Sequence, residues 1–135
     1  MGEFNVGKAK VKFTDSHEWI TLTEKGARVG ITDKAQQELG EIVYIQLPPL
    51  GKEVQAGQEI AIVESTKAAT DVYAPASGVV VAINEQVQNA PSTINCSAED
   101  EGWLFEIQLT NPQELDDLFT RKQYLNMCYN THCGK

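Results

Sequence analysis

Apolar residues recur at every second position through much of this chain, a pattern typical of strands with one buried face. Residues 27–31 read Ala-Arg-Val-Gly-Ile, and residues 103–109 read Trp-Leu-Phe-Glu-Ile-Gln-Leu. Further short β-forming runs, separated by turn residues, lie at 11–13, 19–23, 42–47, 60–63, 72–75 and 79–83. Many short strands at such close spacing predict a mainly β fold, a small sandwich or flattened barrel.

A first helix is predicted in the N-terminal half. Asp33 and Gln36 have the spacing of a capping pair, and Gly40 can end a helix in the left-handed conformation. We therefore expect one short helix before the strand at 42–47. Residues 84–101 are polar and lack a clear period, so they are interpreted as a loop with a short helical piece.

The pattern changes to a helical one near the C-terminus. Asn111 as a cap and Pro112 at the first helical position start a predicted helix, whose inward side is formed by Leu115, Leu118 and Phe119. Thr120 with Gln123 predicts a second capped helix, which carries Tyr124, Leu125 and Cys128. We therefore expect a β core with helices at its end.

Length and charge narrow the class of protein. The 135 residues suffice for one domain, which we place at residues 10–128. A formal net charge of −8 argues against nucleic acid as a partner, and no apolar run approaches the roughly 20 residues that cross a bilayer, so we expect no membrane partner. Residues 1–9 are interpreted as an extension, because Met1-Gly2-Glu3-Phe4 resembles an expression remnant, and residues 129–135 as a tail.

Cysteine usage and motifs argue against several chemistries. Cys96, Cys128 and Cys133 form no CxxC pair and are odd in number, which favours a reducing compartment. His132 with the last two cysteines is too weak a signal to predict a metal site. Neither a glycine-rich phosphate loop nor an acid/base pair or nucleophile at convincing spacing occurs. We therefore predict a protein without catalytic activity of its own.

Lys67 lies where two apolar strands meet, within the octet Glu64-Ser65-Thr66-Lys67-Ala68-Ala69-Thr70-Asp71. The strands on either side predict a hairpin with this lysine at its tip. Position alone favours an ordinary exposed lysine that keeps a turn soluble. The small neighbours, however, leave clearance around the amine, which a lysine that is acylated in another enzyme's active site requires.

This octet closely resembles the lipoyl-attachment site of the glycine cleavage system H-protein family. The resemblance runs from Phe13 to Tyr124 through ordered landmarks: Ser16-His17-Glu18-Trp19, Val29-Gly30-Ile31-Thr32-Asp33, Ala35-Gln36, Leu39-Gly40, Tyr73-Ala74-Pro75, Ser77-Gly78, Asn84-Glu85, Gly102-Trp103-Leu104, and Asn111-Pro112 with Glu114-Leu115. Biotin carriers look like Met-Lys-Met, and lipoyl domains of 2-oxoacid dehydrogenase acyltransferases look like Asp-Lys-Ala. This chain instead has Thr66-Lys67-Ala68.

The resemblance implies a lipoyl-type barrel-sandwich hybrid of two small antiparallel sheets, with short helices including a C-terminal helical segment. It also implies a non-catalytic carrier with lipoate on Lys67 as its cofactor. Glycine decarboxylase (P protein) would load an aminomethyl group onto the arm, and an aminomethyltransferase (T protein) would pass the carbon to tetrahydrofolate. Dihydrolipoyl dehydrogenase (L protein) would reoxidise the dithiol, and a lipoate ligase or lipoyltransferase would attach the arm.

The resemblance also assigns residues around the arm. Ser16, Glu18 and Asp71 are expected in a cleft that excludes water and holds the cationic amine of the loaded arm. Glu64 and Asp71 flank the hairpin and are expected to help the lipoylating enzyme recognise it. Without the resemblance, all four are ordinary turn, cap or surface residues. His17 is interpreted as structural rather than as a general base.

Two alternative functions stay open on the sequence: relay of lipoate to other proteins, and an unmodified protein-binding module of the same fold. A free and an acylated lysine look alike in sequence. Members of the family work in the mitochondrial matrix and in bacterial cytoplasm. The opening residues and the missing leader favour the matrix for this chain.

Overall fold

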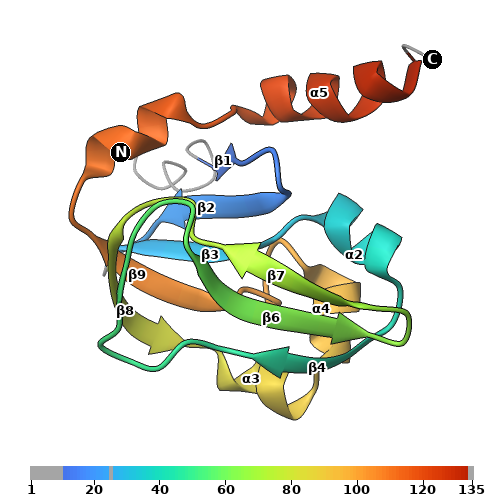
Figure 1. Ribbon diagram of the computed structural model, residues 1–135, viewed down its shortest axis with the longest axis horizontal. Coiled ribbons are helices and arrows are strands. Elements are labelled where there is room, and N and C mark those ends of the chain that lie inside the picture. The colour runs from blue at the N-terminus through green and yellow to red at the C-terminus, as the bar shows by residue number, and fades with distance from the viewer. Residues whose placement is uncertain (1–10, 25, 134–135) are drawn as a thin grey trace.

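The computed structural model describes residues 11–24 and 26–133, with side chains as far as residue 128. It contains two antiparallel sheets and several short helices (Figure 1). The strands are β1 (Lys12–Phe13), β2 (Glu18–Leu22), β3 (Ala27–Ile31), β4 (Ile42–Gln46), β5 (Glu53–Val54), β6 (Glu59–Ser65), β7 (Ala69–Tyr73), β8 (Gly78–Ile83) and β9 (Phe105–Leu109). The helices are α2 (Asp33–Leu39), α3 (Glu85–Asn89), α4 (Ser92–Ser97), the 3₁₀ helix η1 (Pro112–Asp117) and α5 (Arg121–Cys133). The predicted mainly β fold is confirmed, whereas the predicted extension at residues 1–9 lies outside the described residues.

The larger sheet has the strand order β1-β2-β3-β9-β8-β5, and the smaller sheet has the order β4-β6-β7. The larger of two apolar clusters contains residues of both sheets, including Val29 and Ile107 from the larger sheet and Val63 and Val72 from the smaller one. Each of these four side chains is at most 1% exposed. Burial of an aliphatic side chain of this size stabilises the fold by about 1.5–3 kcal/mol. The alternation of buried and exposed positions along the strands therefore determines which faces of the sheets meet.

The N-cap of helix α2 lies one residue earlier than predicted. Thr32 is the N-cap, and its hydroxyl accepts a hydrogen bond from the Ala35 amide at 3.1 Å. Asp33 lies in the first turn, where a carboxylate stabilises the helix dipole, and its side chain accepts from Gln36 at 2.9 Å. Gly40 ends the helix at a positive φ of 84°, as predicted, but its ψ of −153° differs from the left-handed helical cap that was expected. The predicted capping role of Asp33 is therefore wrong, although its pairing with Gln36 is correct.

The segment at residues 84–101, predicted as a loop with a short helical piece, contains two helices. Asn84 caps α3 by accepting from the Gln86 amide at 3.0 Å, and α4 follows after Pro91. Each helix buries a single residue, Val87 in α3 and Ile94 in α4. One buried residue per helix produces no apolar period, so the sequence pattern gave no signal for the second helix.

The first predicted C-terminal helix is a 3₁₀ helix, η1, and it ends before two of the residues expected on its inward side. Leu118 is the C-cap, and Phe119 lies beyond it, where its backbone exchanges two hydrogen bonds of 2.8 Å with Phe13. The Asn111 side chain makes no capping hydrogen bond. Phe119 therefore pairs with β1 at a position where the sequence predicted that the helix would continue.

Helix α5 begins with the predicted capping pair. The Thr120 amide donates to Gln123 Oε1 at 3.0 Å, and the Gln123 amide donates to Thr120 Oγ1 at 3.2 Å. Tyr124 and Cys128 are buried, but Leu125 is 38% exposed and does not join them. The helix continues to Cys133, through the start of the predicted tail. None of the helices in the described part of the chain is long and apolar enough to cross a membrane.

Candidate functional site

Lys67 is exposed at the tip of the hairpin that joins β6 to β7. The strands pair as far as Glu64 opposite Ala69, and the Ser65 hydroxyl then accepts hydrogen bonds from the amides of Lys67 at 3.0 Å and Ala68 at 3.1 Å. The Ser65 amide donates to the Ala68 carbonyl at 2.8 Å. One serine thus closes the turn from within, which leaves the lysine side chain free of any role in holding it.

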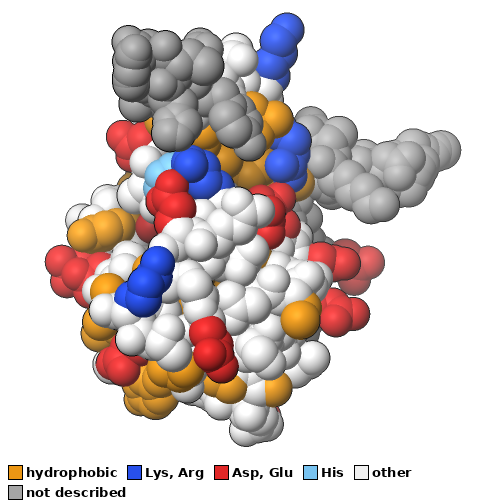
Figure 2. All heavy atoms as spheres, turned by 90° about the vertical axis from the view of Figure 1, so that its right-hand side faces the viewer, with side chains coloured by type: hydrophobic (Ala, Val, Ile, Leu, Met, Phe, Trp, Pro, Cys, Tyr) orange, Lys and Arg blue, Asp and Glu red, His pale blue; other side chains and the backbone are white. Residues whose placement is uncertain are grey.

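The hairpin tip also has a support outside itself. The Thr66 amide donates to the Glu41 carbonyl at 3.0 Å, in the corner between α2 and β4. The stem of Lys67 passes this corner, because a Cβ placed on Gly40 would lie 3.4 Å from Lys67 Cε. The end of the molecule that carries the hairpin has acidic side chains scattered over its surface (Figure 2).

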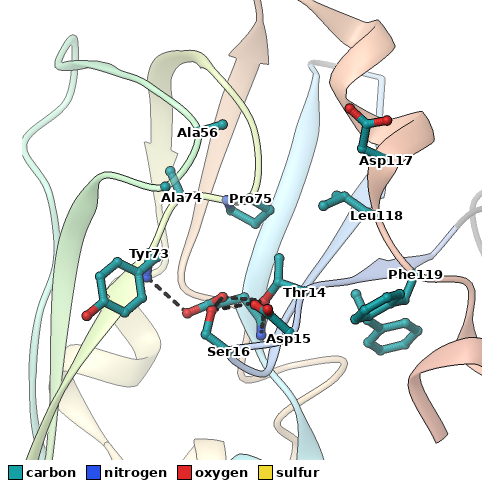
Figure 3. A pocket seen from close by; sticks show the side chains of 13 residues that line it. Thr14, Asp15, Ser16, Ala56, Tyr73, Ala74, Pro75, Asp117, Leu118 and Phe119 are labelled. Carbon is teal, nitrogen blue, oxygen red and sulfur yellow. Dashed lines mark hydrogen bonds between the residues drawn. The ribbon is translucent and has the colours of Figure 1, made fainter. Parts of the chain in front are cut away.

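Glu18 is a buried carboxylate at the start of β2, only 2% exposed. Its Oε1 accepts from the hydroxyls of Thr14 at 2.5 Å and Ser16 at 2.6 Å, and its Oε2 accepts from the Tyr73 amide at 3.0 Å (Figure 3). Burial raises the pKa of Glu18, and these three hydrogen bonds partly oppose that rise. No Lys, Arg or His among the described residues pairs with this carboxylate.

A hollow of about 400 Å³ lies beside Glu18. Thr14 and Ser16 line it from the loop between β1 and β2 (Figure 3), and Glu18 lines it from the start of β2. Most of its other lining residues are apolar or small, namely Phe13, Ala56, Gly57, Tyr73, Ala74, Pro75, Leu118 and Phe119, and two more are the exposed Asp15 and Asp117. The hollow therefore combines apolar walls with three carboxylates, of which Glu18 is the buried one, a combination suited to an apolar chain that ends in a cation.

The structure brings together two of the three residues predicted for the arm cleft. Ser16 donates directly to Glu18, whereas Asp71 is exposed on β7, opposite Ile62 of β6, and lines a separate hollow of about 290 Å³. Asp71 still lies only two residues from Tyr73, whose amide binds Glu18. Glu64 is exposed on β6, three residues before the lysine. The roles assigned to these residues stay predictions.

Sequence reasoning missed two groups that hold Glu18. Thr14 donates from four residues upstream, a spacing that local reasoning could have found. The other donor is the main chain of Tyr73, 55 residues away, which only the pairing of distant strands brings near. Neither group carries a signature of its own in the sequence.

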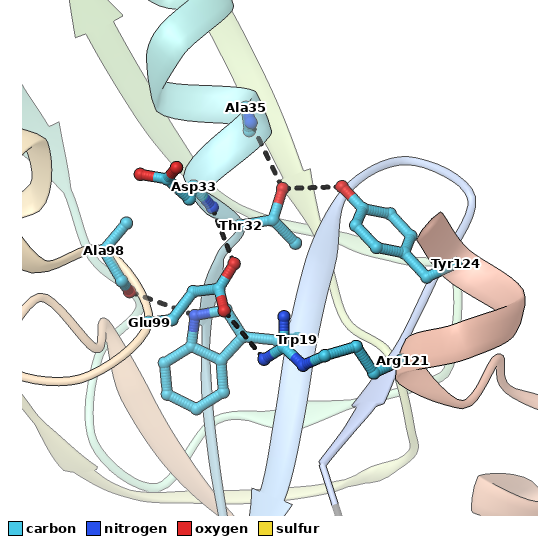
Figure 4. Close-up of polar contacts among 8 residues, drawn as sticks. All are labelled: Trp19, Thr32, Asp33, Ala35, Ala98, Glu99, Arg121 and Tyr124. Carbon is cyan, nitrogen blue, oxygen red and sulfur yellow. Dashed lines mark hydrogen bonds and ion pairs between the residues drawn. The ribbon is translucent and has the colours of Figure 1, made fainter. Parts of the chain in front are cut away.

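A second network of hydrogen bonds supports the loop that carries Ser16 and leads into Glu18. His17 has φ of 74°, and its Nδ1 lies 2.6 Å from the hydroxyl of Tyr124 on α5. That hydroxyl is also 2.8 Å from Thr32 Oγ1, the cap of α2 (Figure 4). All hydrogen bonds are satisfied when Thr32 donates to Tyr124 and Tyr124 donates to His17 Nδ1. Burial raises the pKa of Tyr124, so its hydroxyl keeps its proton. These contacts agree with a structural role for His17.

Comparison with known proteins identifies the family. The model of the glycine cleavage H-protein family matches residues 11–131 of this chain. The chain belongs to the glycine cleavage H-protein family. The glycine cleavage system H protein of Thermotoga maritima is 46% identical over 117 residues, which cover 87% of this chain and 94% of that protein. The one from Legionella pneumophila (strain Corby) is 48% identical over 116 residues, covering 86% of this chain and 93% of that protein.

The fold agrees with a solved member of the H-protein family. The crystal structure of a glycine cleavage system H protein from Mycobacterium marinum superposes with a TM-score of 0.81 at 38% identity, covering 88% of this chain and 96% of that chain. The predicted barrel-sandwich hybrid is thereby confirmed. H proteins are lipoyl carriers of the glycine cleavage system and not catalysts, so the predicted carrier function is confirmed as well. These relatives are bacterial, which gives no support to the predicted mitochondrial matrix.

Proposed function

We propose that this chain carries lipoate in amide linkage to Lys67 and shuttles an aminomethyl group and electrons on that arm. The observation that carries the proposal is the exposed lysine at the β6–β7 tip, with Thr66, Ala68 and Ala69 around it, in a chain of the H-protein family. Amide formation removes the ammonium charge and leaves an apolar arm that ends in a dithiolane. The arm supplies the redox and thiol chemistry, and this chain presents it.

Glu18 is proposed as the receptor for the cationic amine of the loaded arm, with Ser16 as a neighbouring hydroxyl. A buried carboxylate that lacks a cationic partner is costly, and a docked ammonium group would offset that cost. The contact would also lower the pKa of Glu18, because a nearby cation favours the ionised carboxylate. The apolar walls of the adjacent hollow would keep water from the amine, which otherwise departs by hydrolysis.

The length of β7 is compatible with this arrangement. From Ala69 to Tyr73 the strand makes four steps of about 3.3 Å, or about 13 Å in all. An extended lipoyl-lysine has about a dozen bonds from its Cα, which gives a reach on the order of 15 Å. Lys67 lies two residues before Ala69, so an arm folded back along β7 covers most of the way to Tyr73, whose amide holds Glu18. Asp71 lies on the way and is proposed to flank the passing arm.

The proposed partners are the other proteins of the glycine cleavage system: glycine decarboxylase, aminomethyltransferase and dihydrolipoyl dehydrogenase, together with a lipoate ligase or lipoyltransferase. A net charge of −8 supports docking on basic protein surfaces. Glu64, exposed beside the hairpin, is proposed as part of the surface that the lipoylating enzyme reads. The bacterial relatives support a cytoplasmic location within this proposal.

Intact-mass spectrometry tests the proposal. Protein made in cells with an active lipoate ligase and added lipoate should gain one lipoyl group, and the gain should vanish in Lys67→Arg. Lys52→Arg is the matched control, because Lys52 lies outside the hairpin and should leave the modification intact. An unmodified wild-type chain would contradict the proposal and favour the binding-module alternative. Transfer of the arm from Lys67 to a second protein would favour the relay alternative.

A further inference from the structure

Asn95 of α4 binds three groups of the corner that follows α2. Its Oδ1 accepts from the Ile42 amide at 2.9 Å. Its Nδ2 donates to the Gly40 carbonyl at 2.9 Å and to Gln36 Oε1 at 2.9 Å. One side chain therefore fixes the last turn of α2 and the first residue of β4, across 53 to 59 residues of sequence.

The corner that Asn95 fixes is also the corner that supports the lysine hairpin. Glu41 lies between the two residues bound through their backbone, Gly40 and Ile42, and its carbonyl accepts from the Thr66 amide at 3.0 Å. Gly40 lies against the stem of Lys67. Ile42 pairs with Ser65, the residue whose hydroxyl closes the turn. These three contacts of the tip thus each involve a residue that Asn95 holds or one next to it.

We propose that Asn95 is a positioning residue for the acylation of Lys67. Asn95 does not touch the lysine; it fixes the 40–42 corner, and the corner fixes the tip in the geometry that the lipoylating enzyme binds. The inference rests on the proposed function, since it concerns the same lysine. It gives a residue of α4, far from the hairpin in sequence, a role in that modification.

The physical reason lies in the backbone groups that Asn95 satisfies. Without its side chain, the Gly40 carbonyl and the Ile42 amide lose a partner and turn toward water, which displaces the Glu41 carbonyl between them. The tip then keeps only its internal closure by Ser65 and samples other orientations. An enzyme that binds one orientation sees a weaker apparent affinity, in proportion to the fraction of competent molecules. The chemical step on the bound lysine is unchanged.

Asn84 provides a matched control within the same chain. Its Oδ1 accepts from one backbone amide, that of Gln86, and its Nδ2 donates to two carbonyls, those of Glu101 and Trp103. It therefore makes the same number of hydrogen bonds as Asn95. None of its partners belongs to the hairpin or to the 40–42 corner. Asn84→Ala should reproduce a general loss of stability without the specific effect on Lys67.

The experiment measures lipoylation kinetics of the full chain with a purified lipoate ligase. For Asn95→Ala we expect the KM for the carrier to rise about tenfold with kcat within about twofold of wild type, as a tenfold smaller competent population predicts. For Asn84→Ala we expect both constants within about twofold. Equal increases in KM for the two variants, or a change confined to kcat in Asn95→Ala, would overturn the inference.

Hydrogen exchange of the Thr66 amide gives a readout that does not depend on lipoylation. It should speed up at least fivefold in Asn95→Ala and stay unchanged in Asn84→Ala, because only the first variant releases the Glu41 carbonyl. If Asn95→Ala does not fold, Asn95→Asp keeps the volume and the Ile42 contact while removing both Nδ2 donations, and the same exchange is expected. Unchanged Thr66 exchange would overturn the positioning role. A wild-type chain that no ligase modifies would instead contradict the proposed function, with the exchange result unaffected.

Discussion

The two ends of β7 hold functional groups in opposite ways. At its start, Lys67 is exposed on a turn that a single serine closes, with no contact required of its amine. At its end, the Tyr73 amide and two hydroxyls surround Glu18, which is only 2% exposed. In the proposed function, other proteins must reach the lysine, whereas the carboxylate must be kept from water. The contrast supports the proposal that the same short strand presents the lysine at one end and protects the carboxylate at the other.

The largest expected effect concerns the protected end. Glu18→Gln removes the charge and keeps the shape, so a loaded arm should lose its amine at least tenfold faster, because a charge-assisted hydrogen bond is worth about 1.5–3 kcal/mol. The measurement is the release of ammonia from isolated, aminomethyl-loaded protein. Glu64→Gln, at the exposed end, is the control and should leave the lifetime unchanged. Equal lifetimes for wild type and Glu18→Gln would remove Glu18 from the proposed cleft.

The next prediction concerns the hydrogen bonds of Tyr124 that support the loop beside Glu18. Tyr124→Phe deletes the hydroxyl between His17 and Thr32, which should lower the free energy of unfolding by about 1–2 kcal/mol. Urea denaturation measures it. Tyr44→Phe is the control, because Tyr44 is 51% exposed and should change stability by less than about 0.5 kcal/mol. Similar losses in both variants would show that the buried chain through Tyr124 is not a distinct support.

A smaller effect should appear in the dependence of stability on pH. The pKa of Glu18 is raised above its usual value of 4.5 in the folded chain, so between these two values the folded state binds a proton that the unfolded state has lost. Stability contributed by Glu18 is therefore present below about pH 4.5 and falls as the pH rises through the raised pKa. Urea titrations at several pH values give the free energy of unfolding of wild type and of Glu18→Gln. The wild-type value minus the Glu18→Gln value isolates the contribution of Glu18 and should fall as the pH rises. A difference that grows with pH would reverse the sign of the prediction.

The smallest effect is expected at the exposed end. Lys67→Arg should change the free energy of unfolding by less than about 0.5 kcal/mol, because the turn is held by Ser65 and by backbone groups. Thermal unfolding of the unmodified protein measures this change. A loss above about 1 kcal/mol would mean that the lysine stabilises the hairpin, which would weaken the distinction between the two ends.

The sequence allowed the exposed end to be predicted almost completely. Alternating strands, small residues and a short turn are local features, and the hairpin with Lys67 at its tip follows from them. The capping pair of α5 was equally local, since Thr120 and Gln123 are three residues apart. Where the chain decides its structure within a few residues, pattern reasoning succeeds.

The protected end could be predicted only in part. That Ser16 accompanies Glu18 follows from their closeness in sequence, but the Tyr73 donor depends on contact between residues 55 positions apart. Asp71 was expected in the same cleft, and the register of β7 against β6 places it opposite Ile62 and in another hollow. Strand register and the packing of one sheet on the other decide these points, and neither can be read from a single sequence.

The number of residues in β7 also sets the distance between Lys67 and Glu18. The side chains of this strand alternate between two faces, so one inserted residue would turn Val72 outward and Asp71 inward, reversing the faces of the strand. Two inserted residues would restore the faces but carry the attachment point about 6.6 Å farther away. The separation between the tethering residue and Glu18 can therefore change only in such double steps. A tether of fixed length would tolerate few of them.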